Sequence, residues 1–418
     1  MKYTVLRGMK DILPGETIKW EFAELTFRFI SSLYNYSEIR TPVLEPAELF
    51  ARSIGTDTDI VSKEMYSFVD KGERNVTLRP EATASVVRAA LENNLISNEQ
   101  MTKLFYIGPM FRYERPQAGR FRQFHQAGIE VFGSSDPFID AEVIDFAFTY
   151  LKNLGLKNIE VDINSVGCKE CRPGFIKALK KNLEPNLTKL CENCHARFDK
   201  NILRVLDCKK PGCQKYIAGT PSLMEFLCEG CRNHFEGVIE GLEMIKITFK
   251  VCNRLVRGLD YYTKTTFEII SGELGAQNAV CGGGRYDNLV SDFGGQTTPA
   301  VGFAVGLERL IAVMESQNIT IPISKKLDVY IATLGTAAKK KGFQLINELR
   351  SVGIHAETDY LDKSLKSQMK IADRLGASFA LIIGDEEILK GTAILKNMKD
   401  SSQKEIRLGE AITQLRNN

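Results

Sequence analysis

The stretch KLFYIGPMFRYERPQAGRFRQFHQAGIEVFG, residues 103–133, has the pattern of two β-strands joined by the loop RPQAGR. Its central part, residues 111–126, holds four arginines, no lysine and one acid, and most of its other residues are aromatic or glutamine. Guanidinium groups match the oxygens of phosphates and carboxylates, and an aromatic ring offers a nucleobase a flat surface. The stretch therefore predicts a nucleotide site. An exposed hairpin whose arginines pair with surface acids is the alternative.

Strand geometry groups the side chains of this hairpin. Residues of equal parity face the same way on a strand, so Arg112 and Glu114 share a face on the first strand. Arg122, Phe124 and Gln126 share a face on the second. The pattern thus predicts guanidinium groups beside an aromatic ring, which is what a phosphate attached to a base requires.

The whole chain has the composition of a globular protein. Its 418 residues are enough for two or three domains, and 44% are hydrophobic and 26% charged. The 55 basic and 52 acidic residues give a net charge of +3, which excludes a strongly basic tail but not a local basic groove. The polar N-terminus and the lack of about 18 consecutive apolar residues predict a cytoplasmic protein with no membrane partner.

Hydrophobic periodicity predicts the elements of a large mixed-sheet domain. Helices are expected at residues 15–35 and at 81–95, EATASVVRAALENNL, whose first turn is acidic. SEIRTPVLEP, residues 37–46, is expected to form one strand, and the hairpin supplies two more.

Two changes of pattern set the expected domain boundaries. The mixed-sheet domain is expected at 1–164 and 241–320, with a Cys-rich insertion of short helices at 165–240. From residue 327 strands and helices alternate, which predicts a separate α/β domain at 326–418 with a mostly parallel sheet.

Eight of the ten cysteines lie within the insertion. In a reducing cytosol, close cysteine pairs indicate metal or redox chemistry rather than disulfides, and eight thiolates would fill two tetrahedral zinc sites. If the ends of the insertion meet, an outer site would contain Cys168, Cys171, Cys228 and Cys231. An inner site would contain Cys191, Cys194, Cys208 and Cys213. His195 and His234 adjoin the pairs as substitute ligands, and a module of reduced thiols without metal is the alternative.

Three further stretches carry arginines next to glycines. RGLDYYTKTTFE, residues 257–268, places Arg257 and two tyrosines at a tight glycine turn. CGGGRYDNL, residues 281–289, has a triple glycine that lets a ligand or another backbone approach closely. VGFAVGLERL, residues 301–310, places Arg309 near the start of a helix, where free backbone N–H groups favour an anion. A solvated arginine is the alternative.

Together these stretches resemble the three signature motifs of class II aminoacyl-tRNA synthetases. The first is EIRTPVLEPAELFARSIG, with its strand ending at Pro42; the second runs from TLRPEAT through the hairpin; the third is AVGFAVGLERL. LVRGLDYYTKTTFE, GGGRYD and RGMKDILP resemble segments of the histidyl-tRNA synthetase family. The resemblance covers almost the whole chain in order. It implies an α+β catalytic domain on a mostly antiparallel sheet, a mainly helical insertion and a C-terminal anticodon-binding domain.

The resemblance implies a reaction in two steps. The family joins L-histidine to AMP using ATP and then transfers histidine to the 3′ end of its tRNA. In the first step a carboxylate attacks the α-phosphorus in line, and catalysis comes from holding two anions and stabilising the added charge. Arg112 and Arg257 would be the catalytic residues, as cations on opposite sides of the reacting groups.

The resemblance also assigns the two substrates. Arg309 would hold the γ-phosphate, Phe124 would stack on adenine, Glu114 would lie near its amino group, and Mg²⁺ would bridge the outer phosphates; the implied ATP residues are Arg112, Glu114, Arg120, Phe124 and Arg309. Glu81 and Tyr262 would read the imidazole, and Thr83, Gln126 and Glu130 the α-amino group. The implied histidine pocket is Glu81, Ala82, Thr83, Arg112, Gln126, Glu130, Arg257, Tyr261, Tyr262 and Tyr286. Ala82 stands where many relatives carry glycine.

The remaining partners are tRNA and a second copy of the chain. Gln117 is expected at the tRNA acceptor end, and Lys363, Lys366 and Lys370 at tRNA phosphates, with a solvated helix face as the alternative. The first motif implies a homodimer. The competing function is a histidine-sensing regulatory subunit of ATP phosphoribosyltransferase, whose chains typically lack the C-terminal domain and have eroded motifs. A zinc-finger nucleic-acid binder would not explain the motifs outside the cysteine region.

Overall fold

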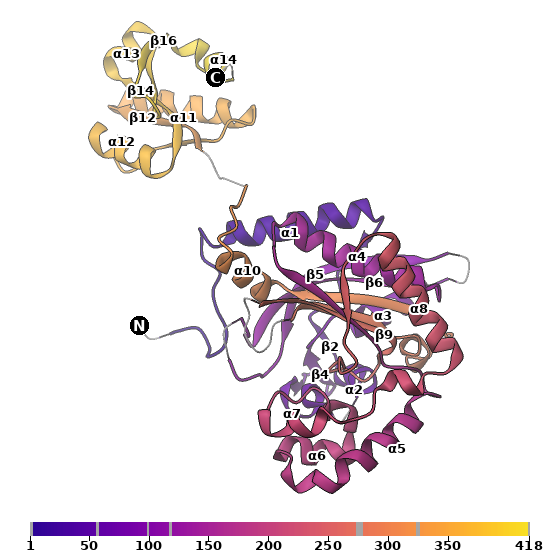
Figure 1. Cartoon of the computed structure of the whole chain (residues 1–418). Helices are drawn as coiled ribbons and strands as arrows, with labels where there is room; N and C mark the ends of the chain where they lie inside the picture. Colours follow the sequence, from indigo (N-terminus) through magenta and orange to yellow (C-terminus); the bar gives the residue numbers. More distant parts are fainter. Residues whose placement is uncertain are drawn as a thin grey trace. The chain divides into compact units, whose positions relative to one another are not determined.

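The computed structural model describes residues 3–55, 58–97, 100–116, 119–272, 279–322 and 327–416. The chain forms two compact units, Met1–Pro322 and Ile323–Asn418 (Figure 1). Among the helices of the described residues, none is both long enough and apolar enough to span a bilayer.

The first unit is built on an eight-stranded sheet in the order β1-β5-β6-β11-β10-β9-β7-β8. Strands pair in parallel only at its two edges, β1 with β5 and β7 with β8, and the inner pairs among the described residues are antiparallel. The mostly antiparallel sheet is therefore confirmed. Its strands are β1 (Ser37–Glu38), β5 (Thr102–Phe111), β6 (Gln123–Phe132), β7 (Ile159–Ser165), β8 (Phe249–Val251), β9 (Thr263–Ser271), β10 (Ala279–Arg285) and β11 (Ala300–Gly306).

Helices cover one face of this sheet (Figure 1). Alternate residues of the strands, such as Ile129 on β6 and Phe303 on β11, are buried there against Phe27 and Phe146 of the helices. This alternation places the intervening residues of the same strands on the opposite face. The covering helices are α1 (Thr17–Leu33), α4 (Pro137–Asn153), α8 (Glu229–Met244) and α10 (Leu307–Ser316).

The predicted strand at 37–46 is wrong, because the segment forms two short strands in different sheets. β1 joins the large sheet, whereas β2 (Leu44–Pro46) pairs with β4 in a three-stranded sheet. Pro42 lies between them and has no N–H to donate to a ladder. The rest of this region consists of α2 (Ala47–Ile54), the π-helical η1 (Ile60–Glu64), β3 (Tyr66–Val69), β4 (Asn75–Leu78), α3 (Thr83–Glu92) and α9 (Leu289–Asp292).

The Cys-rich segment is mainly helical, as predicted. It buries a hydrophobic cluster of its own, in which five of the cysteines are at most 8% exposed. Its elements are α5 (Arg172–Leu183), η2 (Glu184–Lys189), α6 (Glu192–Lys200), η3 (Ile202–Val205), α7 (Pro211–Ile217) and η4 (Leu223–Phe226), and α8 returns the chain to the sheet.

The second unit has a five-stranded sheet in the order β13-β12-β14-β15-β16. β12 pairs in parallel with β13 and β14, but β15 and β16 continue the sheet antiparallel, so the sheet is mixed and not mostly parallel. The five residues 398–402 between β15 and β16 are too few for the crossover that parallel strands need. The elements are β12 (Leu327–Leu334), α11 (Thr336–Ser351), β13 (Ala356–Thr358), α12 (Leu365–Arg374), β14 (Ala377–Gly384), α13 (Asp385–Lys390), β15 (Thr392–Asn397), β16 (Gln403–Arg407), η6 (Leu408–Glu410) and α14 (Ala411–Arg416).

Candidate active site

The sheet face opposite the helices carries three of the predicted site residues, and the others come from loops and helix starts. Even-numbered residues of β6, including Phe124, Gln126 and Glu130, alternate with the core residues of that strand. Glycines stand beside them on the neighbouring strands, because Glu130 pairs with Gly302 of β11 and Gly302 pairs with a glycine of β10. Residues without side chains leave room above the centre of the sheet, so the glycine-rich stretches form the floor of the site.

Arg112 and Phe124 meet at the open end of the hairpin. β5 ends at Phe111, so Arg112 and Glu114 lie just beyond the strand and not on it as predicted. The Arg112 guanidinium carbon lies 5.3 Å from the centre of the Phe124 ring, and its Nε donates to the Pro80 carbonyl at 2.8 Å. Glu114 accepts from Arg120 at 2.9 Å and lies 3.8 Å from Arg112. The predicted pairing of guanidinium and ring is present.

Arg257 and Arg309 approach the same place from other segments. Arg257 lies on the loop before β9 and forms an ion pair with Glu268 of that strand. Glu268 also interacts electrostatically with Arg309, as do Glu114 and Arg120. Burial lowers the pKa of Arg309, and the neighbouring cation Arg120 lowers it further. Three arginines distant in sequence thus interact with the same two acids, Glu114 and Glu268.

A buried cluster of polar and aromatic side chains contains Glu130, which is 1% exposed, and reaches Arg257, whose guanidinium carbon lies 5.9 Å from the centre of the Tyr262 ring. Thr83 donates a hydrogen bond to the Glu130 carboxylate at 2.7 Å, and the Tyr286 hydroxyl donates to its other oxygen. Burial raises the pKa of Glu130 to about 8, although both hydroxyls act in the opposite direction. A carboxylate so poorly solvated favours a cationic partner such as an ammonium group.

Aromatic and polar groups complete this buried cluster. The rings of Tyr261 and Tyr262 lie 4.7 Å apart, and that of Tyr286 meets Tyr261 edge to face at 5.6 Å. Gln126 has a buried Oε1 with no hydrogen-bond partner among the described residues. Glu81 precedes α3 instead of lying in its first turn, and its carboxylate accepts from the N–H groups of residues 83 and 84. Burial raises the pKa of Glu81.

The other predicted residues lie in various places. Ala82 is 1% exposed beside Glu81, so its methyl group is accommodated within the core. Gln117 lies outside the described residues. In the second unit Lys366 and Lys370 are exposed on α12, and Lys363 just before it is half-buried.

Several residues of the site were not predicted from the sequence. Glu268 pairs with Arg257, and Tyr106 is buried beside the pocket residues. Glu308, next to Arg309, accepts from the backbone N–H of His125 at 2.9 Å and thereby joins α10 to β6. The position of Glu308 inside the third motif could have marked it as a site residue. Its hydrogen bond with His125 could not be predicted, because it depends on how α10 packs against β6.

A buried ion-pair network lies next to Tyr286 of this cluster. Arg285, fully buried, donates to Asp140 of α4 at 2.5 Å, and His234 of α8 contacts the same carboxylate at 2.8 Å. Burial alone would raise the pKa of Asp140, but Arg285 and His234 hold it below its ordinary value. His234 therefore has a structural partner and does not join the cysteines. Arg285 precedes Tyr286, so the network fixes the strand end that carries this tyrosine.

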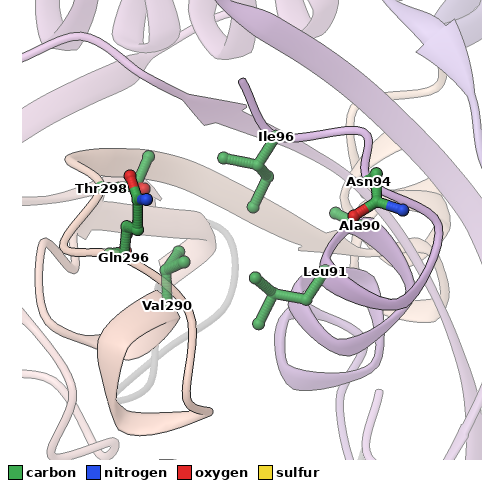
Figure 2. Close-up of a pocket in the computed structure, with 7 residues that line it drawn as sticks. All are labelled: Ala90, Leu91, Asn94, Ile96, Val290, Gln296 and Thr298. Atoms are coloured by element: carbon green, nitrogen blue, oxygen red, sulfur yellow. The ribbon is translucent and has the colours of Figure 1, made fainter. Parts of the chain in front are cut away.

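A separate cavity of about 290 Å³ lies between the end of α3 and the segment after α9 (Figure 2). Its lining mixes apolar side chains with uncharged polar ones: Ala90, Leu91, Asn94, Ile96, Val290, Gln296 and Thr298. None of the predicted site residues lines it, and it has no charged group that would bind an anion.

The cysteines form the two groups that their spacing predicted. One contains Cys168, Cys171, Cys228 and Cys231, and the other Cys191, Cys194, Cys208 and Cys213, with the sulfur atoms of each group within 4.8 Å of one another. Burial raises the pKa of a thiol, but backbone N–H groups outweigh it at Cys168 and lower its pKa to about 7. Each group offers four ligands and can hold a metal ion.

Comparison with known proteins connects this geometry to a family. The sequence profile of histidyl-tRNA synthetase matches residues 8–192 and 228–310, and that of the anticodon binding domain matches residues 328–418. Histidine–tRNA ligases of Halothermothrix orenii and Pelotomaculum thermopropionicum are 54% and 52% identical, each over 98% of this chain and over 98% and 96% of their own. The crystal structure of apo S. aureus histidyl-tRNA synthetase matches with a TM-score of 0.84 at 38% identity, covering 99% of both chains.

Similarity at this level runs through both units. The relatives are histidine–tRNA ligases, and they match this chain over nearly their full length. The anticodon-binding profile covers the second unit. Both findings support the function of a ligase and not that of a regulatory subunit. The ordered sequence motifs, the arrangement of the arginines and the similarity to these relatives all indicate the same family. The chain belongs to the histidyl-tRNA synthetase family of class II aminoacyl-tRNA ligases.

Proposed function

We propose that this ligase activates histidine between Arg112, Arg257 and Arg309. The histidine carboxylate attacks the α-phosphorus of ATP, a new O–P bond forms, and pyrophosphate leaves from the opposite side. Both reactants are anions, so cations on either side of the reacting atoms hold them in line and stabilise the added charge. The terminal adenosine of the tRNA then takes histidine from the adenylate, and AMP leaves.

The geometry of the hairpin supports the ATP residues of this proposal. Phe124 stacks on adenine, and the adjacent Arg112 reaches the α-phosphate, since the ring and guanidinium are 5.3 Å apart. Glu114 lies near the adenine amino group, Arg120 beside it helps to bind ATP, and Arg309 holds the γ-phosphate. Enzymes of this family use ATP and Mg²⁺, and a bound ion would neutralise part of the negative charge of the phosphates near Arg309.

The buried pocket selects histidine by polar contacts. Glu130, Thr83 and Gln126 bind the α-amino group, and a glutamate whose burial disfavours its own charge gains most from an ammonium partner. Glu81 and Tyr262 read the two imidazole nitrogens. An analogue without those nitrogens would leave buried polar groups unpaired. Ala82, Tyr261 and Tyr286 line the pocket.

The observation that carries the proposal is the sharing of Glu114 and Glu268 among the three arginines. Glu114 lies beside Arg112 and interacts with Arg309, and Glu268 pairs with Arg257 and also interacts with Arg309. In these positions the two acids keep the three guanidinium groups close to one another. The triphosphate of ATP and the carboxylate of histidine would give these guanidinium groups more strongly charged anionic partners.

The same proposal includes the remaining partners. Gln117 meets the tRNA acceptor end, and the lysines near α12, Lys363, Lys366 and Lys370, contact tRNA phosphates. Two copies associate through the first motif, where Leu44 is 48% exposed, and α1 exposes a stripe of Leu25, Phe29 and Leu33. The enzyme works in the cytoplasm. Zn²⁺ occupies the two groups of four cysteines.

Histidine-dependent exchange of pyrophosphate into ATP tests the activation step, and charging of separated tRNAs tests the transfer. We expect Arg112→Ala and Arg257→Ala each to lower the exchange rate by about 10²–10³-fold, because each removes a charge aimed at the transition state. Arg115→Ala is the matched control, since Arg115 lies in the same loop and is exposed. An equal loss of exchange rate in Arg112→Ala, Arg257→Ala and Arg115→Ala would contradict the assigned roles. Exchange that depends on another amino acid would contradict histidine as the substrate.

A further inference from the structure

The outer cysteine group, Cys168, Cys171, Cys228 and Cys231, has the dimensions of a tetrahedral metal site. The sulfur of Cys168 lies 3.5 Å from that of Cys171 and 3.9 Å from that of Cys228. Four sulfurs each about 2.3 Å from a Zn²⁺ ion at the centre of a tetrahedron lie about 3.8 Å apart. The N–H of Cys228 donates to the Cys171 sulfur at 3.1 Å, a contact that stabilises a thiolate.

Arg172, which directly follows a cysteine of this group, extends to the histidine pocket. Its Nη2 donates to the backbone carbonyl of Tyr262, and its Nε donates to the Val166 carbonyl at 3.1 Å. Val166 in turn donates to the Lys264 carbonyl at 2.7 Å, and Lys264 donates to the Gly167 carbonyl at 3.0 Å. The backbone that carries the first cysteines is thus bonded to Lys264, two residues after the pocket tyrosine, and Arg172 is bonded to the tyrosine itself.

The electrostatics of the site explain why an arginine stands there. Four thiolates around Zn²⁺ would carry a net charge of −2. The Arg172 guanidinium interacts with the charge of Asp260 first, and then with those of Cys168, Cys171 and Cys231. One guanidinium therefore offsets part of the negative charge of the metal site while its donors hold the carbonyl of Tyr262. Without the ion, the start of α5, which carries Arg172, would lose the link to the start of α8 that Cys228 and Cys231 provide.

The outer group also lies in the part of the chain that the family shares. The histidyl-tRNA synthetase profile covers residues 8–192 and 228–310, which include all four outer cysteines. The unmatched residues 193–227 contain Cys194, Cys208 and Cys213 of the inner group. The outer group is therefore attached to the catalytic part of the chain.

We propose that a Zn²⁺ ion held by the outer cysteine group positions the histidine pocket by fixing Arg172 against the Tyr262 carbonyl. The inference rests on the proposed function, because it uses the zinc and the histidine pocket assigned there. Arg172 is a positioning residue, since it acts through the backbone of Tyr262 and touches no substrate.

Metal content is tested first, on the full-length protein purified without chelators under reducing conditions. We expect about two zinc ions per chain by elemental analysis, about one after Cys171→Ser, and about two after Cys252→Ser, which lies outside both groups. Fewer than one zinc ion per chain, or disulfides within the outer group by mass spectrometry, would overturn the inference. Histidine-dependent exchange would still be observed in that case, so the proposed reaction would stand.

The link to the pocket is tested with Arg172→Ala and a matched control. Arg232 follows Cys231 as Arg172 follows Cys171, but its side chain is exposed. We expect Arg172→Ala to keep its zinc and to raise the KM for histidine about tenfold, with the KM for ATP changed less than about threefold. A tenfold change corresponds to about 1.4 kcal/mol. Arg172→Lys should recover part of the loss, and Arg232→Ala should behave like the parent.

A measurement on the unmodified protein covers the case in which Arg172→Ala does not fold. Coupling between two binding sites is reciprocal, so an ion that strengthens histidine binding must itself be held more tightly when histidine is bound. At equilibrium with a competing chromophoric chelator, one of the two zinc ions should be held severalfold more tightly when histidine is present, and ATP alone should leave both affinities unchanged. Zinc affinities that do not change with histidine, or equal KM values for histidine in the alanine variants of Arg172 and Arg232, would overturn the positioning role.

Discussion

Glu130 shows how far a single residue of the site could be predicted. It was assigned to the histidine site by the family resemblance, whereas strand parity was argued only for Arg122, Phe124 and Gln126. The structure has Glu130 on β6 with Phe124 and Gln126. Its donors, Thr83 and Tyr286, come from α3 and from the segment after β10, and no local pattern indicates such contacts. Glu268 and His125 were not predicted for the same reason. Their partners, Arg257 and Glu308, are determined by strand register and by the packing of a helix on the sheet, which no local pattern indicates.

The raised pKa of Glu130 makes the stability of the protein depend on pH. Its pKa is about 8 in the folded state, against an ordinary value of 4.5. Between these values the unfolded chain has lost the proton that the folded protein keeps. The folded state binds more protons in this window, so stability falls as the pH rises through it.

Glu130→Gln removes this titration. We expect the variant to gain stability relative to the parent as the pH rises from 5 to 8, by on the order of 2–4 kcal/mol, with no further gain above pH 8. Urea unfolding at several pH values measures the difference, and Glu236→Gln on the exposed side of α8 is the control. The same variant should bind histidine more weakly. A stability difference that does not vary with pH would contradict the assignment.

At the scale of elements, the sequence predicted the pattern of strands better than their pairing. Alternation and turns indicated the hairpin of β5 and β6, and its two strands pair as predicted. The segment with Pro42 was expected as one strand because its composition is extended throughout, yet its two halves join different sheets. The C-terminal sheet was expected mostly parallel because helices alternate with its first strands, whereas the short connection after β15 makes the last pair antiparallel.

Packing of β10 against the loop before β9 explains one glycine of the GGGRYD stretch. A methyl group on Gly282 would lie 2.5 Å from Nη1 of Arg257 and 2.8 Å from its guanidinium carbon. The strand therefore has room for the arginine only because this position lacks a side chain. Close approach, and not a special backbone angle, is the reason for the glycine.

Gly282→Ala should displace Arg257 while the fold remains intact, because the flexible arginine can yield. We expect the rate of pyrophosphate exchange to fall by about 10–100-fold, as a displacement near 1 Å does in other sites. Gly272→Ala just after β9 is the control, since a methyl group there would meet nothing within 4 Å. Equal rates in the two variants, with melting temperatures also equal, would show that Arg257 does not need this space.

At the scale of the whole molecule, each unit buries a core composed of its own residues. The clusters of the first unit contain residues up to Ile321, and those of the second begin at Leu327. The change to alternating strands and helices indicated this division in the sequence, and the two compact units agree with it. Separate cores imply that each unit can fold without the other.

A chain of residues 1–322 tests this independence together with the division of labour. All residues proposed to touch histidine or ATP precede residue 310, so we expect histidine-dependent pyrophosphate exchange to stay within about threefold of the parent. Charging of tRNA should fall by at least about 10²-fold, because the contacts of the anticodon-binding unit contribute to affinity for tRNA. Full-length Lys366→Ala with Lys370→Ala provides the intermediate case, with a raised KM for tRNA and a weaker dependence on salt. Loss of exchange in a shortened chain that remains folded by circular dichroism would mean that the second unit also supports the chemistry of activation.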